Sequence, residues 1–370
     1  MKHTTLRPLL ALISRTFVFT VTVTIGLAGF GAPTAKAEPF FAVKTGFQCQ
    51  QCHVSPSGGG QRTAFGTIWA QTELANFSIP DQPTFTGDIG NIFRIGAQAR
   101  LSGTQFEFDD QDDELNFEVD RVSVFLNAQV NKYVSIYVDQ NFAPTSLNRE
   151  AWVKFQYNNF YLRAGSLFLP HGLRIEDDTA FIREATGFNF NNNDDGAEFG
   201  FINDRWSVQL AITNGTNGVA ETDDGKQFSA RAAYTRPNWR FGVSGNRNDT
   251  DFGDREVYGA FAGFKTGPVY WLAEYDRIKE SDVDGLPDTD QDVAFLEANI
   301  ELLKGNFLKL TAESLTFDTE QEDQYRYSVV YEWFPWSFTE LRLGFRFDDS
   351  DGNNPALNGE EAFFQANIFF

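Results

Sequence analysis

Residues 93–101 read Phe-Arg-Ile-Gly-Ala-Gln-Ala-Arg-Leu, and in this stretch apolar and polar side chains alternate one by one. An alternation with a period of two places the two sets of side chains on opposite faces of a β-strand. The same pattern recurs along the chain, at 121–130, 151–157, 206–212, 228–234 and 341–347. These stretches predict many strands, each apolar on one face and polar on the other.

The connections between these stretches alternate in length. Short links lie at 131–132, 158–159, 203–204, 236–238, 266–267, 304–305 and 335–336. Longer polar links lie between them, as at 215–226, 279–291 and 348–360. Short periplasmic turns and long outer loops are typical of bacterial outer-membrane barrels. We therefore predict an all-β fold, an antiparallel outer-membrane β-barrel of about 16 strands, an even number as such barrels require.

Composition limits the alternatives. No run of ~20 apolar residues follows the first 37, which excludes a helical membrane protein. The formal charge of -21 argues against nucleic acid as a partner. A soluble all-β sandwich is the alternative, but it does not need outward-facing aromatics at strand ends. The final stretch, residues 362–370, alternates and ends on Phe370, which resembles the terminal strand of bacterial outer-membrane proteins.

The only two cysteines lie in Cys49-Gln50-Gln51-Cys52-His53. This is the C-x-x-C-H pattern, in which both thiols bond to one haem c and the adjacent histidine is the proximal iron ligand. A local disulfide, a redox C-x-x-C and half a zinc site are the alternatives. A zinc site lacks its second ligand pair, and a thioredoxin-type motif lacks its βαβ context. We predict one covalent haem held by Cys49, Cys52 and His53.

An export signal precedes the motif. Lys2, Arg7 and Arg15 form a positive region, an apolar run follows, and Ala35-Lys36-Ala37 fits the cleavage rule. We expect a signal peptide over residues 1–37, a haem c segment with its linker over 38–88, and a porin-like barrel over 89–370. Within the haem segment, 61–75 predicts a helix whose Phe65, Ile68, Trp69 and Leu74 cover the porphyrin, and 79–83 predicts a linker.

Two further metal contacts follow from residue types. Met1 is the only methionine, so a Met/His pair on the iron is excluded, and His171 is the candidate distal ligand. It would reach the iron if the long link from Leu169 to Asp195 folds into the pore, as long barrel loops often do. The aspartates of the loop 282–292 suggest a Ca²⁺ site, because alternating oxygen ligands suit a hard cation.

Cationic side chains gather on the predicted inner face, at Arg94, Arg100, Arg121, Lys154, Arg163, Arg231, Arg240 and Arg346. They suit anions or haem propionates in the lumen, whereas acidic links such as 109–114 would attract cations at the outer mouth. Acidic loops that merely keep the surface solvated are the simpler alternative. The haem segment is therefore expected in the barrel lumen or on its periplasmic side.

Two stretches resemble known families. Residues 164–173 and 179–184 resemble the corresponding region of phosphate-selective porins of the O/P type. A signal peptide, residues 39–42 and 45–47, and the C-x-x-C-H motif leading into a barrel resemble the fused monohaem cytochrome–porins of iron-oxidising bacteria. The second resemblance implies an outer-membrane electron conduit from extracellular Fe(II), or another redox donor, to a periplasmic carrier. Any enzymatic activity would be of the iron(II)–cytochrome c oxidoreductase type. The alternatives are a diffusion porin, anion-selective if its inner cations act on solutes, with a haem-bearing plug or sensor, and a haem enzyme or redox sensor facing the periplasm.

Overall fold

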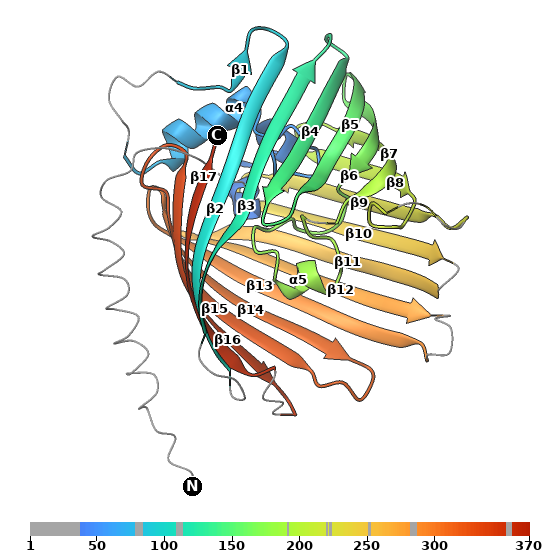
Figure 1. The fold of residues 1–370 in the computed structure, drawn as a ribbon, viewed down its shortest axis with the longest axis vertical. Helices are drawn as coiled ribbons and strands as arrows, with labels where there is room; N and C mark the ends of the chain where they lie inside the picture. Colours follow the sequence, from blue (N-terminus) through green and yellow to red (C-terminus); the bar gives the residue numbers. More distant parts are fainter. Residues whose placement is uncertain are drawn as a thin grey trace.

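The protein is described by a computed structural model of residues 38–77, 84–108, 114–190, 192–219, 221, 224–250, 253–281, 287–352 and 357–370. Within these ranges the chain forms one large antiparallel sheet that closes on itself (Figure 1). Its sixteen wall strands are β2 (Phe93–Phe108), β3 (Glu114–Gln129), β4 (Val134–Ala143), β5 (Leu147–Tyr157), β6 (Phe160–Leu167), β7 (Asp194–Ile202), β8 (Trp206–Thr213), β9 (Gln227–Arg236), β10 (Trp239–Thr250), β11 (Gly253–Thr266), β12 (Val269–Ser281), β13 (Thr289–Leu303), β14 (Asn306–Phe317), β15 (Gln324–Trp333), β16 (Thr339–Ser350) and β17 (Gly359–Phe369).

Each wall strand pairs with the next one in the chain, and β17 pairs with β2 to close the ring. The closing register runs from Gly359 opposite Phe108 to Phe369 opposite Gln98. A two-residue strand, β1 (Asp88–Ile89), pairs with the start of β2. The predicted all-β barrel of about 16 strands is confirmed, because every wall strand finds two neighbours and no edge is left open.

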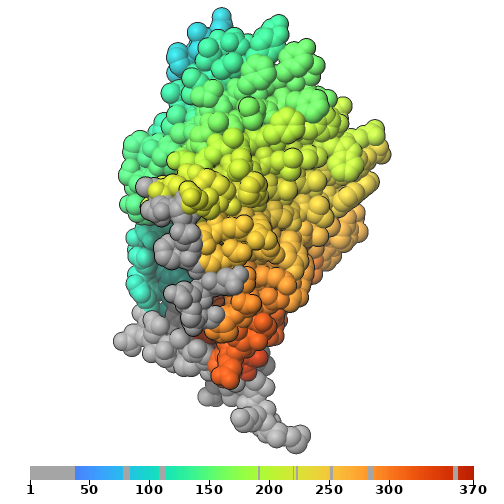
Figure 2. Space-filling view, turned by 90° about the vertical axis from the view of Figure 1, so that its right-hand side faces the viewer, coloured from blue at the N-terminus to red at the C-terminus, as the bar shows by residue number. Residues whose placement is uncertain are grey.

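The alternation in the sequence separates the outer wall from the lumen. In β3, Val124 and Leu126 are exposed on the outside, whereas Ser123 and Phe125 are buried inside. Similar apolar side chains are exposed on the other strands. Figure 2 shows one side of the molecule in a space-filling view. An apolar outer wall with polar groups inside is the arrangement that lipid contact requires.

The two ends of the barrel differ in their connections. At one end every connection is short, the longest being residues 334–338 between β15 and β16. At the other end lie the long connections, including 168–193 between β6 and β7 and 214–226 between β8 and β9. By the rule used for the sequence, the first end is periplasmic and the second is extracellular.

An N-terminal segment crosses the lumen near the end with short connections (Figure 1). This plug segment, residues 38–77, contains α2 (Pro39–Thr45), α3 (Cys49–Cys52), α4 (Ala64–Trp69) and the π-helical turn η1 (Ala70–Leu74). None of the helices in the described ranges is long and apolar enough to cross a membrane.

Hydrogen bonds attach the plug segment to distant parts of the wall. The amide of Asn238 donates to the carbonyl of Val43 at 2.7 Å, and the amide of Asn76 donates to that of Phe334 at 2.8 Å. On another side of the barrel, the amide of Gln61 donates to the hydroxyl of Tyr137 at 3.1 Å. Because these contacts lie on β4, in the turn after β9 and in the turn after β15, the segment is anchored across the lumen rather than along one wall.

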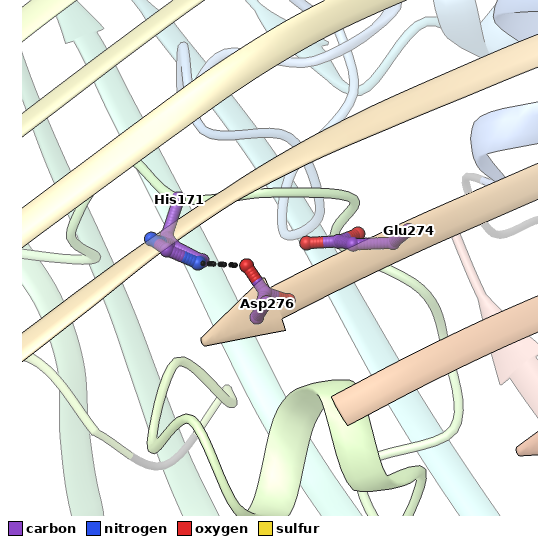
Figure 3. Close-up of side chains that lie close together, drawn as sticks. All are labelled: His171, Glu274 and Asp276. Atoms are coloured by element: carbon purple, nitrogen blue, oxygen red, sulfur yellow. Dashed lines mark hydrogen bonds and ion pairs between the residues drawn. The ribbon is translucent and has the colours of Figure 1, made fainter. Parts of the chain in front are cut away.

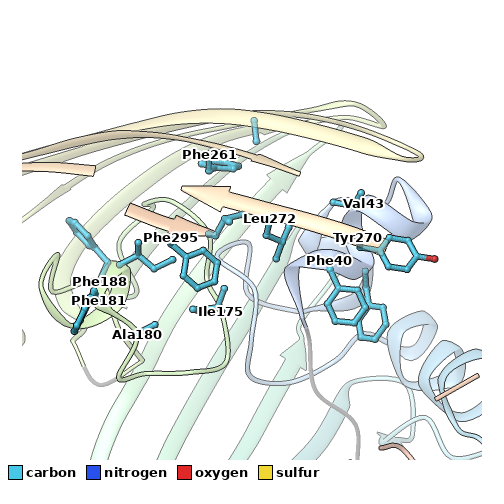
Figure 4. Packing of buried hydrophobic residues seen from close by; sticks show 14 of the residues in the cluster. Phe40, Val43, Ile175, Ala180, Phe181, Phe188, Phe261, Tyr270, Leu272 and Phe295 are labelled. Carbon is cyan, nitrogen blue, oxygen red and sulfur yellow. The ribbon is translucent and has the colours of Figure 1, made fainter. Parts of the chain in front are cut away.

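The long link after β6 also turns into the lumen. We call residues 168–190 the inserted loop; it includes the short helix α5 (Phe181–Glu184), which contacts β12, β13 and β14. Its apolar side chains Ile175, Phe181 and Phe188 join the plug residue Phe40 in one buried cluster against the wall (Figure 4). The inserted loop and the plug segment together fill much of the barrel interior.

Several sequence predictions differ from the structure or fall outside it. The helix predicted over 61–75 begins at Ala64, because Thr63 caps it by accepting a hydrogen bond from the Gly66 amide at 3.1 Å. The signal peptide 1–37, the linker 79–83 and most of the acidic link 109–114 lie outside the described residues, so these remain predictions.

The predicted Ca²⁺ loop is described only in part. Residues 282–286 lie outside the described ranges, while Asp290 and Asp292 belong to β13. Asp290 forms an ion pair with Arg277 at 2.5 Å, and Asp292 accepts a hydrogen bond from the Tyr275 hydroxyl at 2.6 Å. These two carboxylates therefore already have protein partners, and Ca²⁺ binding stays a prediction.

Candidate functional site

One cavity in the lumen lies between the plug segment, the inserted loop and the wall. It is a cavity with about 890 Å³ of empty space, part of it continuous with solvent. Cys49, Cys52 and His53 all line it. The three residues that the sequence singles out for haem attachment thus face one common space inside the barrel.

Local sequence fixes the helix that carries both thiols. Gln48 precedes α3, and its amide donates to the side-chain oxygen of Gln51 at 2.8 Å, which is half of a capping box. Gly66 of α4 lies so close to this helix that a Cβ there would meet the Cys52 carbonyl oxygen at 2.2 Å. Only glycine allows α4 to pack at this distance, so the two helices hold the motif between them.

The imidazole of His53 has one nitrogen occupied and one available. Its Nδ1 lies 2.8 Å from the carbonyl oxygen of Gly59, to which it donates, so that Nε2 carries the free lone pair. Burial, with a smaller contribution from Arg62, lowers the pKa of His53 from 6.5 to about 3. The imidazole is therefore neutral at pH 7, the protonation state that a metal ligand needs.

The thiol of Cys52 does not ionise readily. Cys49 and Cys52 form no disulfide, and burial raises the pKa of Cys52 to about 11, against a smaller opposing effect of Arg62. A protonated thiol does not favour the redox or zinc alternatives, both of which use a thiolate. The environment is apolar on this side, with Phe41, Phe47 and Trp69 also lining the cavity.

Four arginines line the same cavity, namely Arg62, Arg174, Arg231 and Arg240. The guanidinium of Arg62 stacks over the Phe369 ring at 4.1 Å, and its Nη2 has no hydrogen-bond partner among the described residues. The Nε of Arg240 likewise has none. Buried donors without partners are costly, so these groups fit a ligand that brings anionic oxygens. Apolar rings, two thiols, a neutral imidazole and free guanidinium donors together suit a haem with its two propionates.

Not every predicted contact lies at this cavity. Trp69 lines it, but Phe65 and Ile68 are exposed and Leu74 packs into the apolar cluster around Phe40. Sequence analysis included Arg231 and Arg240 in the inner cationic set but missed Arg62. That residue lies just before α4 in an isolated β-bridge with His53, where no periodic pattern reveals the direction of a side chain.

His171 also lines the cavity, from the inserted loop. Its Nε2 lies 2.9 Å from Oδ1 of Asp276, and its ring stacks on Phe188 at 4.1 Å. The remaining nitrogen, Nδ1, has no hydrogen-bond partner in the described part of the chain. The inserted loop thus folds into the lumen, which distal ligation by His171 requires. Nδ1 is the nitrogen that could bind iron, and iron ligation by His171 stays a prediction.

Buried ion pairs hold the elements around the cavity. Arg163 on β6 pairs with Glu150 and Glu198 at 2.9 Å each, and it also donates to Ser57 of the plug segment at 2.8 Å. Lys309 on β14 pairs with Glu38 of the plug segment at 2.7 Å. These inner charges thus bind the plug to the wall, a role that sequence analysis did not assign to them.

A second, larger space lies at the extracellular end, with about 1340 Å³ of empty volume lined by both arginines and acidic residues. A smaller cavity lies between the two. It shares His53, Gly59 and Arg62 with the plug cavity and Arg121 with the outer one. His53 thus lines both the cavity at the plug segment and the smaller cavity that borders the outer one.

The comparisons with known proteins identify the fold. No family model matches the chain, and no curated protein matches it in sequence. OmpT of Vibrio cholerae is 13% identical, with a TM-score of 0.57 over 76% of this chain and 99% of that one. The anion-selective porin from Comamonas acidovorans is 10% identical, with a TM-score of 0.58 over 75% and 98%. The outer-membrane channel DcaP of Acinetobacter baumannii is 12% identical, with a TM-score of 0.56 over 75% and 97%. The fold is that of the sixteen-stranded outer-membrane porins.

Proposed function

We propose that the chain is an outer-membrane barrel with one covalent haem c in its lumen, which carries electrons between an extracellular donor and a periplasmic carrier. The placement of Cys49, Cys52 and His53 on one buried cavity inside the wall carries this proposal. The hydrocarbon core is ~30 Å thick, so a haem below the barrel could not exchange electrons with a donor outside. A haem at this cavity would lie between the two mouths.

The chain's own residues would hold the haem as follows. Cys49 and Cys52 would each form a thioether, and Nε2 of His53 would ligate the iron. Arg62, Arg231 and Arg240 would pair with the propionates, and Trp69 and Phe41 would pack against the ring. When bound, the haem supplies a reversible one-electron carrier, and the protein sets its potential by ligation, charge and burial.

A donor would approach from the extracellular side. The outer cavity is lined by the carboxylates of Glu118, Asp120, Asp177, Asp178 and Glu361. Together with the acidic loops, these groups would attract a metal cation such as Fe(II), an effect that weakens as salt rises. The protein would lower no barrier by acid–base chemistry; it would position a donor near an electron carrier and keep solutes from passing.

A diffusion porin, with the plug segment as a haem-bearing plug or sensor, is the second candidate. The comparisons favour it over the electron conduit, because the matched proteins bear the names of porins and a channel, and one is called anion-selective. Arg100, Arg121, Arg342 and Arg346 around the outer cavity would suit anions. What supports the conduit instead is the filling of the lumen by the plug segment and the inserted loop.

Sealed vesicles with a defined protein orientation test the two candidates. Cytochrome c is enclosed as acceptor, and Fe(II) is added outside; a matched preparation carries the double variant Cys49→Ser/Cys52→Ser. We expect the enclosed cytochrome c to be reduced with the wild-type protein and not with the variant. Rapid release of small anions, together with a haem that outside reductants do not reduce, would establish the porin instead.

A further inference from the structure

We propose that His171, Glu274 and Asp276 form a binding site for one divalent first-row transition-metal ion inside the barrel. The three side chains converge from the inserted loop and from β12 (Figure 3). The site is distinct from the thiols of the plug segment, and the proposal does not depend on a bound haem.

The strand geometry explains how the two carboxylates meet. Glu274 and Asp276 are two residues apart on β12, so both point to the inner face of the wall. One possible ligand atom from each of the three residues lies within 4.8 Å of the other two. His171 and Glu274 are each 4% exposed and Asp276 is 0% exposed, so the cluster is fully enclosed by protein.

One carboxylate oxygen of the cluster lacks a hydrogen-bond partner. Oδ2 of Asp276 has no hydrogen-bond partner among the described residues, although the side chain is completely buried. A buried carboxylate oxygen without a partner is costly, and bound metal is one of the few ways to satisfy it.

The charge balance points the same way. The guanidinium of Arg183 interacts electrostatically with both carboxylates. The carboxyl groups of Glu274 and Asp276 also interact with each other, by charge and through a side-chain hydrogen bond, which requires a proton between them. A divalent cation would displace that proton and hold both carboxylates ionised.

The donor set defines the class of ion. One imidazole nitrogen with two carboxylate oxygens suits Zn(II), Mn(II) or Fe(II), whereas Ca²⁺ prefers oxygen ligands alone. Stacking of His171 on Phe188, with 12° between the ring planes, fixes the direction of the imidazole. Its Nε2–H now donates to Asp276, and metal binding at Nε2 would shift that proton to Nδ1. The metal site and distal haem ligation through Nδ1 are therefore alternatives, which metal binding to the wild-type protein distinguishes.

A purely structural latch is the competing explanation. Glu274 accepts a hydrogen bond from the Leu173 amide at 2.6 Å through Oε2, and Gly172 leaves room for its other oxygen. These contacts fasten the inserted loop to β12 with or without a metal. The latch explains Glu274, but it leaves Oδ2 of Asp276 without a partner.

Equilibrium dialysis of the purified full-length protein against Mn(II), followed by electron paramagnetic resonance, tests the proposal. Competition with Zn(II) then measures the affinity for the second ion. We expect one saturable site per barrel, equally in the wild type and in the haem-free variant Cys49→Ser/Cys52→Ser. Because the haem-free variant is included, failure of the proposed electron transfer would leave this result unaffected.

Substitution of the ligands gives the decisive comparison. Asp276→Asn and His171→Gln are each expected to weaken Mn(II) and Zn(II) binding at least tenfold. The control Glu256→Gln removes a carboxylate that forms a partly exposed ion pair with Arg247 on the wall, and it should leave the affinity unchanged. A change of gel mobility on heating identifies the variants that fold as barrels. If Asp276→Asn does not fold, His171→Gln provides the comparison with the wild type. Absence of a saturable site in the wild type, or unchanged affinity in a folded ligand variant, would overturn the proposal.

Discussion

Nδ1 of His53 lies 2.8 Å from the carbonyl oxygen of Gly59, six residues further along the chain. This hydrogen bond selects the imidazole tautomer in which Nε2 carries the free lone pair, and His53 lines the cavity that both thiols line. A carbonyl partner of this kind orients metal-ligating histidines in general. The glycine-rich turn after the C-x-x-C-H motif therefore fixes the orientation of the His53 imidazole.

Gly59→Ala should disturb this bond. Gly59 has a φ of +72°, and a Cβ there would meet the ring of Phe190 at 2.6 Å. The turn must move to relieve the contact, so we expect an altered visible spectrum and a shifted midpoint potential of the haem. Gly90→Ala is the matched control, because its φ is +63° with nothing within 4 Å of the added Cβ. It should cost only the backbone strain, about 1 kcal/mol. Identical spectra and potentials in the Gly59 variant would contradict this role.

Lys309→Met should release the plug segment. Lys309 bridges Glu38 of the plug and Glu332 of the wall at 2.7 and 2.9 Å, and all three side chains are buried. Removal of one partner leaves buried carboxylates unpaired, at a cost of about 3–5 kcal/mol. We expect residues 38–77 to become accessible to protease and the ion conductance of single barrels in planar bilayers to rise.

A surface pair provides the control for that change. Lys226 pairs with Glu221 at 2.8 Å, but both side chains are partly exposed. Solvent screens such a pair, so Lys226→Met should change neither protease accessibility nor conductance measurably. Equal conductance of the wild type and the Lys309 variant would show that this ion pair does not hold the plug.

Acid should undock the plug when no haem is bound. The pKa of His53 falls from 6.5 to about 3 on burial, so the docked state disfavours the protonated imidazole. The neutral His53 imidazole therefore favours the docked state fully above pH 6.5. This contribution to the free energy of docking, about 5 kcal/mol in all, is lost as the pH falls toward 3. In the Cys49→Ser/Cys52→Ser protein, protease protection of residues 38–77 should decline across this range.

His53→Gln on the same haem-free background isolates the imidazole. Carboxylates that titrate in the same window act in both proteins, so the difference between their pH profiles belongs to His53. We expect a flatter profile without the histidine. Superimposable profiles would mean that His53 is not buried in the docked plug.

His171→Ala tests the predicted distal ligation. If Nδ1 of His171 ligates the iron, the substitution should convert a low-spin spectrum of the haem-loaded protein to a high-spin one. Asp120→Asn, a luminal change away from His171, should leave the spectrum as it is. A low-spin spectrum that persists in His171→Ala removes this residue from the ligand set.

The strands were predictable because their signal is local. Alternation at Val124, Phe125 and Leu126 already separates the outer wall from the lumen, and each strand needs only its neighbours to satisfy its hydrogen bonds. The haem motif is likewise local, since both thiols and the imidazole fall within five residues.

The fastening of the plug could not be predicted in the same way. Gln61 and Tyr137 are 76 residues apart, and no periodic pattern relates them. The meeting of His171 with Asp276 depends on the path of the inserted loop. Charged residues on the inner face of β12 were the available signal for Glu274 and Asp276, but sequence analysis considered only the inner cations.

Covalent haem on a folded barrel is the central claim, and one gel measures it. The outer-membrane fraction of a host competent in haem attachment should yield a single band that stains for haem and shifts in mobility on heating. The Cys49→Ser/Cys52→Ser variant should lose the stain and keep the shift, because the sheet closes without the haem. A wild-type band from that host that shifts on heating but carries no haem would contradict the claim.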